Sequence, residues 1–344
     1  MAPVRKLFRP SVLLPTLPGL ALVAALLAFG DVRRVLALLS TFHAPALIAI
    51  LLVLAGYETL QAVQWSRLLG AEGIRVPLRA RLFAFLVGDT ARVLPIGNYV
   101  ENYLLLREEG IDLGLSSAAT TVSVLIEVAV CLAGLVLLGL GSWGWLRPLI
   151  LIGLGVFLSV VWALHTRRHA GALPAWLSQR RWLLRALEEV RQFRRGAAAL
   201  AHPRVLAPAA LLGAGYVLLG GTALYLVVRG LGVDGVSWAQ VLAVYCFSIA
   251  FALIFPLPVD LGVYEASGAG AFLAVGVDKS VAVSAMLLLR ALSTGTAVAV
   301  ALGTIVLLRD EVRVILRGPS PPSPEAAQAG EGGSETWAED ASEE

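Results

Sequence analysis

Residues 94–104 read LPIGNYVENYL, a polar stretch in a chain that is otherwise rich in Leu, Val and Ala. Pro95 and Gly97 interrupt a helix, and Asn98 and Glu101 carry side chains that lipid excludes. Such a stretch is either a surface loop or, in a membrane protein, a segment kept away from lipid. The rest of the chain decides between these two interpretations.

The composition is that of a membrane protein. The chain has 344 residues, of which 58% are hydrophobic and 15% charged, and its mean hydropathy is +0.80. These values lie outside the range of soluble globular chains. A helix needs roughly 20 apolar residues to cross a bilayer core. We therefore predict an all-α, polytopic helical membrane protein with spans at 12–30, 43–63, 115–140, 147–165, 205–228, 237–257 and 280–308.

The distribution of basic residues predicts the orientation in the membrane. Residues 166–204 hold nine arginines, so this linker and the N-terminal residues 1–11 are expected to be cytoplasmic. Within the linker, WLSQRRWLLRALEEVRQFRR predicts a basic amphipathic helix. That helix either lies in the headgroup region beside anionic lipid or is a solvated connector whose arginines only enforce the topology.

The C-terminal residues differ in composition from the membrane part. Beyond Arg317 the chain is rich in Pro, Gly, Ser and acid, and holds seven of the 24 acidic residues and no basic one. We expect a disordered acidic tail at 311–344 and one integral membrane domain at 12–310.

The topology answers the question posed by LPIGNYVENYL. If residues 82–106 were one full span, every later segment would be inverted and the arginine-rich linker would face outward. We therefore expect a broken or re-entrant element that enters from the cytoplasmic side and lines a cavity. A second copy occurs at 255–278, FPLPVDLGVYEASGAGAFLAVGVD, which repeats the order proline, glycine, Tyr, Glu and then Gly-Val-Asp.

Paired interrupted segments point to a transporter-type site near the bilayer midplane. They give two broken segments in an internal repeat, and a crossing by residues 261–277 raises the seven spans to eight. That eighth crossing places the arginines at 309–317 inside.

The segment after the first broken element carries a polar stripe. Ser116, Thr120, Ser123 and Glu127 follow each other at intervals of four, three and four, which places them on one helical face. Ser and Thr on membrane helices usually bond their own backbone or a neighbouring helix. Glu127 favours a functional face, because a carboxylate at membrane depth is costly.

The remaining intramembrane charges complete the candidate site. Arg92 and Arg290 are the basic groups expected at membrane depth, and a guanidinium binds phosphate in a bidentate manner. Glu101, Glu127 and Glu265 are expected to set the local charge and to exchange protons. A buried pair such as Asp89 with Arg92 that only fixes helix packing remains an alternative. The predicted substrate-binding set is Glu58, Asp89, Arg92, Asn98, Glu101, Glu127, Asp260, Glu265 and Arg290.

Three blocks make the chain resemble a known family. They are WSRLLG at 65–70, the broken element and helix at 94–127, and LGVYEA at 261–266 followed by Arg290. The chain resembles, over about residues 10–310, the flippase-like membrane proteins that include the transmembrane region of lysylphosphatidylglycerol synthases. The resemblance implies an eight-helix-type domain that moves a lipid or polyprenyl-phosphate-linked headgroup between leaflets.

Individual positions carry that resemblance further. Pro95 and Glu101 are similar to the family's first broken element, and Gly262, Glu265 and Arg290 to its second. The chain departs from the family's pattern at Gly97, Val100, Val128, Cys131, Val259 and Asp260.

Three functional classes remain open. The first is a lipid flippase or transporter, and the second is an accessory membrane subunit of an envelope lipid or glycan synthesis enzyme. The third, an enzyme, is not expected, since the resemblance implies that synthase chemistry lies in a separate soluble domain. No GxSxG, HExxH or Walker loop occurs, so we expect no catalytic residue, metal or cofactor.

The expected partners follow from the same observations. They are membrane lipids, either an anionic phospholipid or a lipid-linked saccharide, and not nucleic acid. An oligomer is compatible with the sequence. A bacterial inner membrane is the expected location.

Overall fold

The computed structural model describes residues 17–40, 42, 44–74, 76–90, 101, 102, 105, 111, 113–139, 151, 155, 159, 181–254 and 262–307. Within these residues the chain is helical, and none of them lies in a strand. The helices are α3 (Leu17–Phe29), α4 (Val32–Ser40), α5 (Ala44–Ala71), α6 (Leu78–Thr90), α8 (Leu113–Gly139), α10 (Arg181–Leu200), α11 (Pro203–Gly230), α12 (Trp238–Ile254), α13 (Val263–Ala274) and α14 (Lys279–Leu307).

Four of the described helices are long and apolar enough to cross a membrane. They are α5, α8, α11 and α14, with candidate spans of 25 to 28 residues. At about 1.5 Å per residue, helices of this length cover the bilayer core of about 30 Å. The prediction of a polytopic helical membrane protein is confirmed, and these helices match the predicted segments at 43–63, 115–140, 205–228 and 280–308.

The other predicted segments are shorter helices or lie largely outside the described residues. The segment at 12–30 contains α3, and a separate helix, α4, follows after Asp31, whose φ of 61° turns the chain. α12 covers most of 237–257. At 147–165 only Leu151, Gly155 and Ser159 are described, and all three are helical.

Most of both predicted broken elements lies outside the described residues, which leave out 91–100 and 255–261. On either side of these ranges, α6 is described to Thr90 and Glu101 is helical, while α12 is described to Ile254 and α13 begins at Val263. α13 has 12 residues and rises about 18 Å, which is less than the bilayer core. The expected crossing by 261–277 is therefore not made by this helix alone.

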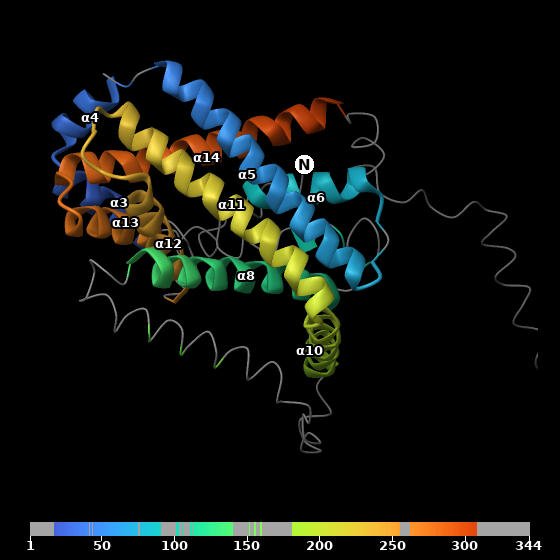
Figure 1. Cartoon of the computed structure of the whole chain (residues 1–344). Helices are drawn as coiled ribbons and strands as arrows, with labels where there is room; N and C mark the ends of the chain where they lie inside the picture. The colour runs from blue at the N-terminus through green and yellow to red at the C-terminus, as the bar shows by residue number, and fades with distance from the viewer. Residues whose placement is uncertain are drawn as a thin grey trace, which may run out of the picture. The chain divides into compact units, whose positions relative to one another are not determined.

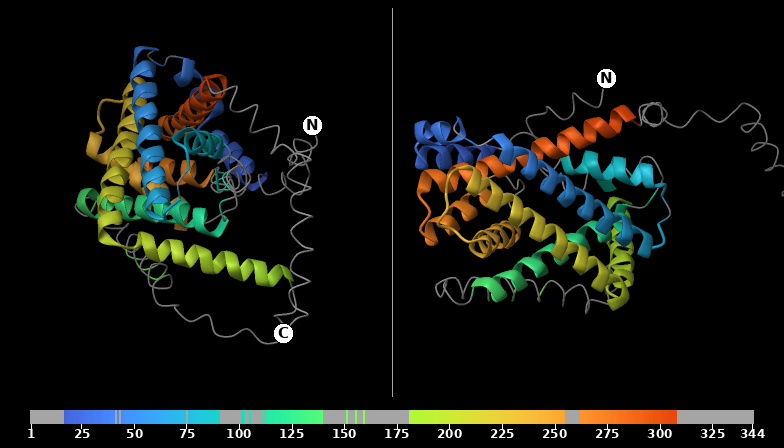
Figure 2. Two further views of the ribbon diagram at one scale, coloured as in Figure 1. Left: turned by 90° about the vertical axis from the view of Figure 1, so that its right-hand side faces the viewer. Right: turned by 45° about the horizontal axis from the view of Figure 1, so that its top comes forward.

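α11 packs against three other helices. It packs along α5 and also contacts α12 and α8, as Figure 1 and the two views of Figure 2 show. Glycine permits one of these close approaches, because a Cβ on Gly220 would collide with the ring of Tyr245 in α12. Small residues let membrane helices approach closely in this way. Buried apolar side chains from α11, α12, α13 and α14 form the larger hydrophobic core.

The chain divides into two compact units at the end of α14. The first unit ends at Ala301, and the second begins at Leu302. The cavity and all contacts discussed below belong to the first unit. Of the second unit the structure describes residues 302–307, so the predicted tail at 311–344 lies outside the described residues.

Candidate functional site

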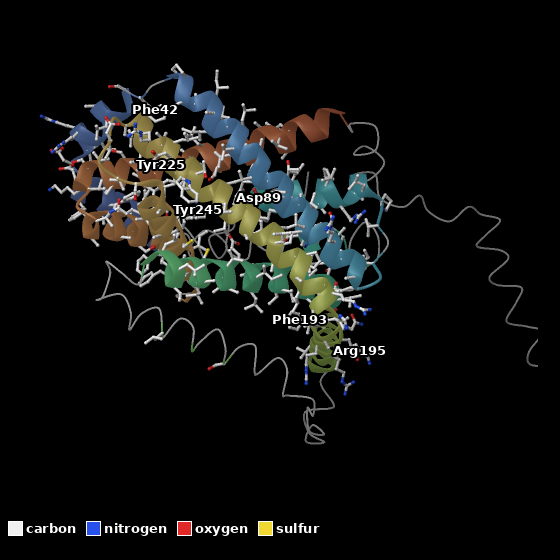
Figure 3. All side chains as sticks on the ribbon, viewed as in Figure 1. Phe42, Asp89, Phe193, Arg195, Tyr225 and Tyr245 are labelled. Atoms are coloured by element: carbon white, nitrogen blue, oxygen red, sulfur yellow. The ribbon has the colours of Figure 1, made fainter. Side chains whose placement is uncertain are left out.

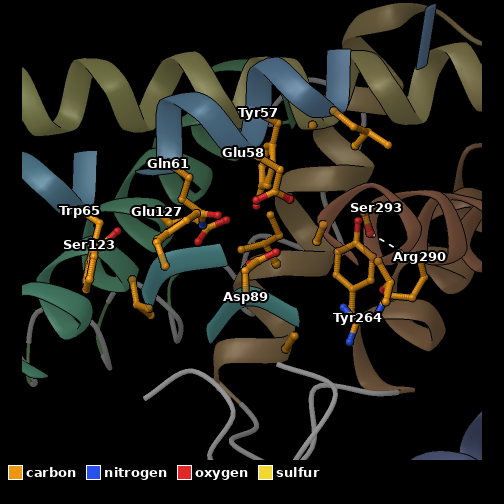
Figure 4. Close-up of a pocket in the computed structure, with 18 of the residues that line it drawn as sticks. Tyr57, Glu58, Gln61, Trp65, Asp89, Ser123, Glu127, Tyr264, Arg290 and Ser293 are labelled. Atoms are coloured by element: carbon orange, nitrogen blue, oxygen red, sulfur yellow. Dashed lines mark hydrogen bonds between the residues drawn. The ribbon is translucent and has the colours of Figure 1, made fainter. Parts of the chain in front are cut away.

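A cavity of about 190 Å³ lies between the helices of the first unit. Its wall is formed by α5, α6, α8, α11, α12, α13 and α14 together with Glu101, and Figure 4 shows part of it in close-up. The polar or aromatic lining residues are Tyr57, Glu58, Gln61, Trp65, Phe85, Asp89, Glu101, Thr120, Ser123, Glu127, Tyr245, Tyr264, Arg290, Ser293 and Thr294.

α5 places one polar face on the cavity. Glu58, Gln61 and Trp65 follow at intervals of three and four residues, so they lie on the same side of the helix. Glu58 and Gln61 are 5% and 3% exposed. A carboxylate buried within a membrane helix is expensive, which makes a role in the cavity more plausible than a role in packing alone.

α8 contributes most of the polar stripe that the sequence predicts. Thr120, Ser123 and Glu127 line the cavity, whereas Ser116 is buried outside the lining. Figure 4 shows the carboxylates of Glu58, Asp89 and Glu127 facing one space. These three acids come from α5, α6 and α8, so the tertiary fold gathers them from three separate segments.

Thr120 connects the first broken element to α5 and α8. Its hydroxyl donates to Oε1 of Glu101 at 3.2 Å. The same oxygen accepts from Nε1 of Trp65 at 3.1 Å and from Nδ2 of Asn102 at 3.0 Å. One donor and two acceptor positions are what a hydroxyl offers, so Thr120 is fully used. This network holds Glu101 at the cavity wall.

A second hydrogen-bond chain stiffens the wall behind the cavity. Ser123 donates through Oγ to Oε1 of Gln64 at 2.6 Å. Nε2 of Gln64 in turn donates to the backbone carbonyl of Ala209 in α11 at 2.8 Å. Because Gln64 is fully buried, loss of either contact would leave a buried amide atom without a partner.

α14 supplies the described cation of the site, Arg290, beside Glu265 of α13. Nε of Arg290 lies 3.4 Å from Oε1 of Glu265, and the two side chains are 26% and 1% exposed. The other carboxylate oxygen of Glu265 accepts from the backbone N–H of Gly262 at 2.6 Å. Glu265 therefore caps the first turn of α13 and holds Arg290 at the same time. A negative charge at this helix end is also favourable to the helix dipole.

The distribution of charge along the cavity is uneven. Arg290 lies beside the ring of Tyr264, apart from the carboxylates of Glu58 and Glu127 (Figure 4). Among the described lining residues there are four carboxylate side chains and one guanidinium. The arrangement can hold an anionic group at Arg290 and groups that donate hydrogen bonds or carry positive charge at the acids.

The structure brings most of the described candidate residues together. Glu58, Asp89, Glu101, Glu127 and Arg290 line the cavity. Glu265 lies behind Arg290 and is absent from the lining. The other predicted residues, Arg92, Asn98 and Asp260, lie outside the described residues.

Several cavity residues were not predicted from the sequence. Tyr57, Trp65, Tyr245 and Tyr264 were missed because an aromatic side chain in an apolar segment is typical of a helix core. For Trp65 a signal was present, since it follows Glu58 and Gln61 at helical spacing. No comparable signal marks Tyr245, which reaches the cavity through the packing of α12 against α11.

Comparison with known protein families identifies the family of this chain. The family described as the lysylphosphatidylglycerol synthase transmembrane region matches residues 17–303. No curated protein matches the sequence. The matched range contains all the described residues that line the cavity.

Proposed function

The chain belongs to the family of the lysylphosphatidylglycerol synthase transmembrane region, and from this membership we propose that it binds a phosphate-bearing lipid in its cavity and moves that lipid between leaflets. It is a multi-pass membrane protein. A bacterial inner membrane is the location that we propose, because of the arginine-rich linker and the family. Binding and transport, rather than an enzymatic reaction, are the proposed activity.

The observation that carries this proposal is Arg290 at the wall of an intramembrane cavity. A guanidinium at membrane depth is retained when it serves a ligand or a partner. Oε1 of Glu265 lies 3.4 Å from Nε of Arg290, an ion-pair contact at one edge of the guanidinium. A planar guanidinium can offer two N–H groups to two oxygens of one phosphate.

The carboxylates narrow the chemistry of the proposed headgroup. Among the described lining residues, four carboxylate side chains share the cavity with one arginine, and together they repel a ligand that carries only negative charge. They favour a headgroup whose phosphate is followed by hydroxyl or ammonium groups, which donate hydrogen bonds to carboxylates. A lipid-linked sugar and an aminoacylated phospholipid both meet this requirement. The family's description refers to lysylphosphatidylglycerol, a lipid of the second kind.

Native mass spectrometry of the purified protein tests the binding step. We expect the wild-type protein to retain a phosphate-bearing lipid, and Arg290→Ala to lose it. Arg290→Lys should also retain less lipid, because lysine keeps the charge and lacks the planar fork. The matched control is Arg229→Ala, since Arg229 forms an ion pair with Asp234 at 2.6 Å outside the cavity.

Two results would argue against this function. One is equal lipid retention by the wild type, Arg290→Ala and Arg229→Ala. The other is a wild-type protein that retains only lipids in proportion to their abundance in the membrane, which would favour the accessory-subunit alternative.

A further inference from the structure

α10 lies at the level where three candidate spans begin or end. α5 ends at Ala71, α8 begins at Leu113, and α11 begins at Pro203, shortly after α10 ends at Leu200. α10 packs against α8 and also contacts α5. Figure 1 shows α10 beside the end of α11 that is nearest in the chain. Since the ends of spans lie near the membrane surface, this packing puts α10 at headgroup level.

The inner face of α10 is fixed to the protein by specific contacts. Gly196 packs against Leu115 and Ala118 of α8, and Leu200 is fully buried. Oε2 of Glu189 accepts from the backbone N–H of Gly114 at 2.5 Å. The charge of Glu189 is thus placed at the N-terminus of α8, where the helix dipole favours an anion.

The outer face of α10 is basic. Arg191, Arg194 and Arg195 project on the side opposite Gly196 and Leu200, because of the 100° rotation per residue. The side chain of Arg191 is 64% exposed. Arg195, labelled in Figure 3, is also exposed, and Arg194 is half-buried. One acid, Glu188, lies 3.5 Å from Arg191. Arg204 and Arg67, at the adjoining ends of α11 and α5, are also exposed.

We propose that this outer face of α10, formed by Arg191, Arg194 and Arg195, binds the headgroups of anionic phospholipids on the membrane side predicted to be cytoplasmic. Three arginines held rigidly at headgroup level complement a negative membrane surface. The rigid attachment matters, because a helix already docked on α8 loses little conformational freedom when lipid binds. This surface lies apart from the cavity, so the inference is independent of the proposed function.

The test uses the full chain in vesicles with a fluorescent probe on α10. Cys131 and Cys246 are replaced by Ala, and Ala198→Cys carries an environment-sensitive fluorophore, because Ala198 is exposed between the arginines on the outer face. Two vesicle preparations contain the labelled protein. One also contains nitroxide-labelled phosphatidylserine as the quencher, and the other contains nitroxide-labelled phosphatidylcholine. We expect stronger quenching by the anionic lipid, and a weaker preference at high salt.

Charge variants identify the residues that carry the preference. Each neutralised arginine should lower the enrichment of anionic lipid about fivefold. In the double variant Arg191→Gln/Arg195→Gln, the two nitroxide lipids should therefore quench the fluorophore almost equally. Arg33→Gln is the matched control, because Arg33 is exposed on α4, away from α10. Arg290→Ala should leave the preference intact, which separates this surface from the cavity.

Three results would overturn the inference. Equal quenching of the wild type by both lipids would show that α10 has no preference for anionic headgroups. An unchanged preference in Arg191→Gln/Arg195→Gln would place the lipid contact elsewhere. Full quenching by aqueous iodide with none by either nitroxide lipid would make α10 a solvated connector.

Discussion

Arg290 and Glu265 form the residue pair on which the proposed site depends. Glu265 is 1% exposed, so removal of the arginine leaves a carboxylate in the protein interior. Removing one partner of a buried pair costs about 3–5 kcal/mol. We expect Arg290→Ala to lower the melting temperature markedly, and Arg290→Ala/Glu265→Gln to recover part of the loss. The amide oxygen that Glu265→Gln introduces can still accept from the backbone N–H of Gly262.

Thermal unfolding of the wild type, Arg290→Ala, Glu265→Gln and the double variant completes a double-mutant cycle, which measures the coupling between the two side chains. If the double variant loses as much stability as the two single changes together, the pair is uncoupled. Glu265 would then act only as the cap of α13.

Glu72 gives a prediction of pH dependence outside the spans. It follows α5 and packs against Gly196 of α10, and neither carboxylate oxygen has a hydrogen-bond partner among the described residues. Burial raises the pKa of Glu72 from its ordinary 4.5 to about 8. Between these values the folded protein binds a proton that the unfolded chain has lost. Stability therefore falls as pH rises from about 4.5 to 8.

Glu72→Gln stays neutral and should remove this dependence. We expect the melting temperatures of the variant and the wild type to be similar near the lower end of this pH range. The variant should become the more stable protein towards its upper end. Glu188→Gln, at an exposed carboxylate on α10, is the control and should show no such trend. A constant difference between Glu72→Gln and wild type across this pH range would contradict the assignment.

At the scale of elements, the two predicted broken segments place a glutamate against different partners. Glu101 contacts Thr120 of α8, and Glu265 contacts Arg290 of α14. The first glutamate therefore meets a hydroxyl, whereas the second meets a guanidinium. This difference concentrates negative charge in the first half and the described cation in the second.

The contact of α6 with the first broken segment leaves no space for a side chain. A Cβ on Gly88 would lie 2.9 Å from the backbone nitrogen of Glu101, and a backbone atom cannot rotate away. We expect Gly88→Ala to separate α6 from Glu101, and to reduce both the melting temperature and lipid retention. Gly70→Ala is the control, since a Cβ there meets nothing within 4 Å. Normal lipid retention by Gly88→Ala would show that the position of Glu101 is unimportant.

The long helices could be predicted because apolar length is a local property of the sequence. That Thr120, Ser123 and Glu127 share one face of α8 could also be predicted, because their helical spacing alone places them there. The contact of Glu265 with Arg290 was not, because it depends on how α13 folds back against α14. α4 was missed because the apolar window ends before it, and a turn at Asp31 separates it from α3.

At the scale of the molecule, the cavity and the basic outer face of α10 are two separate sites, and we propose a role for each at the membrane. The cavity gathers charges from both halves of the chain, whereas α10 belongs to the segment between those halves. A transporter of this design would bind its headgroup near Arg290 and rest on the bilayer through α10.

Movement of lipid between the two leaflets of a vesicle is the direct test of the proposed transport. Full-length protein is reconstituted into vesicles that carry a fluorescent aminoacylated phosphatidylglycerol or a fluorescent polyprenyl-phosphate-linked sugar. An impermeant reductant added outside bleaches the fluorescent lipid in the outer leaflet. The slower loss of fluorescence that follows reports the movement of fluorescent lipid from the inner leaflet to the outer one. We expect faster bleaching with wild type and with Arg229→Ala than in protein-free vesicles, and no such acceleration with Arg290→Ala. Acceleration that persists in a folded Arg290→Ala, or no acceleration by wild type with either lipid, would contradict the proposed transport.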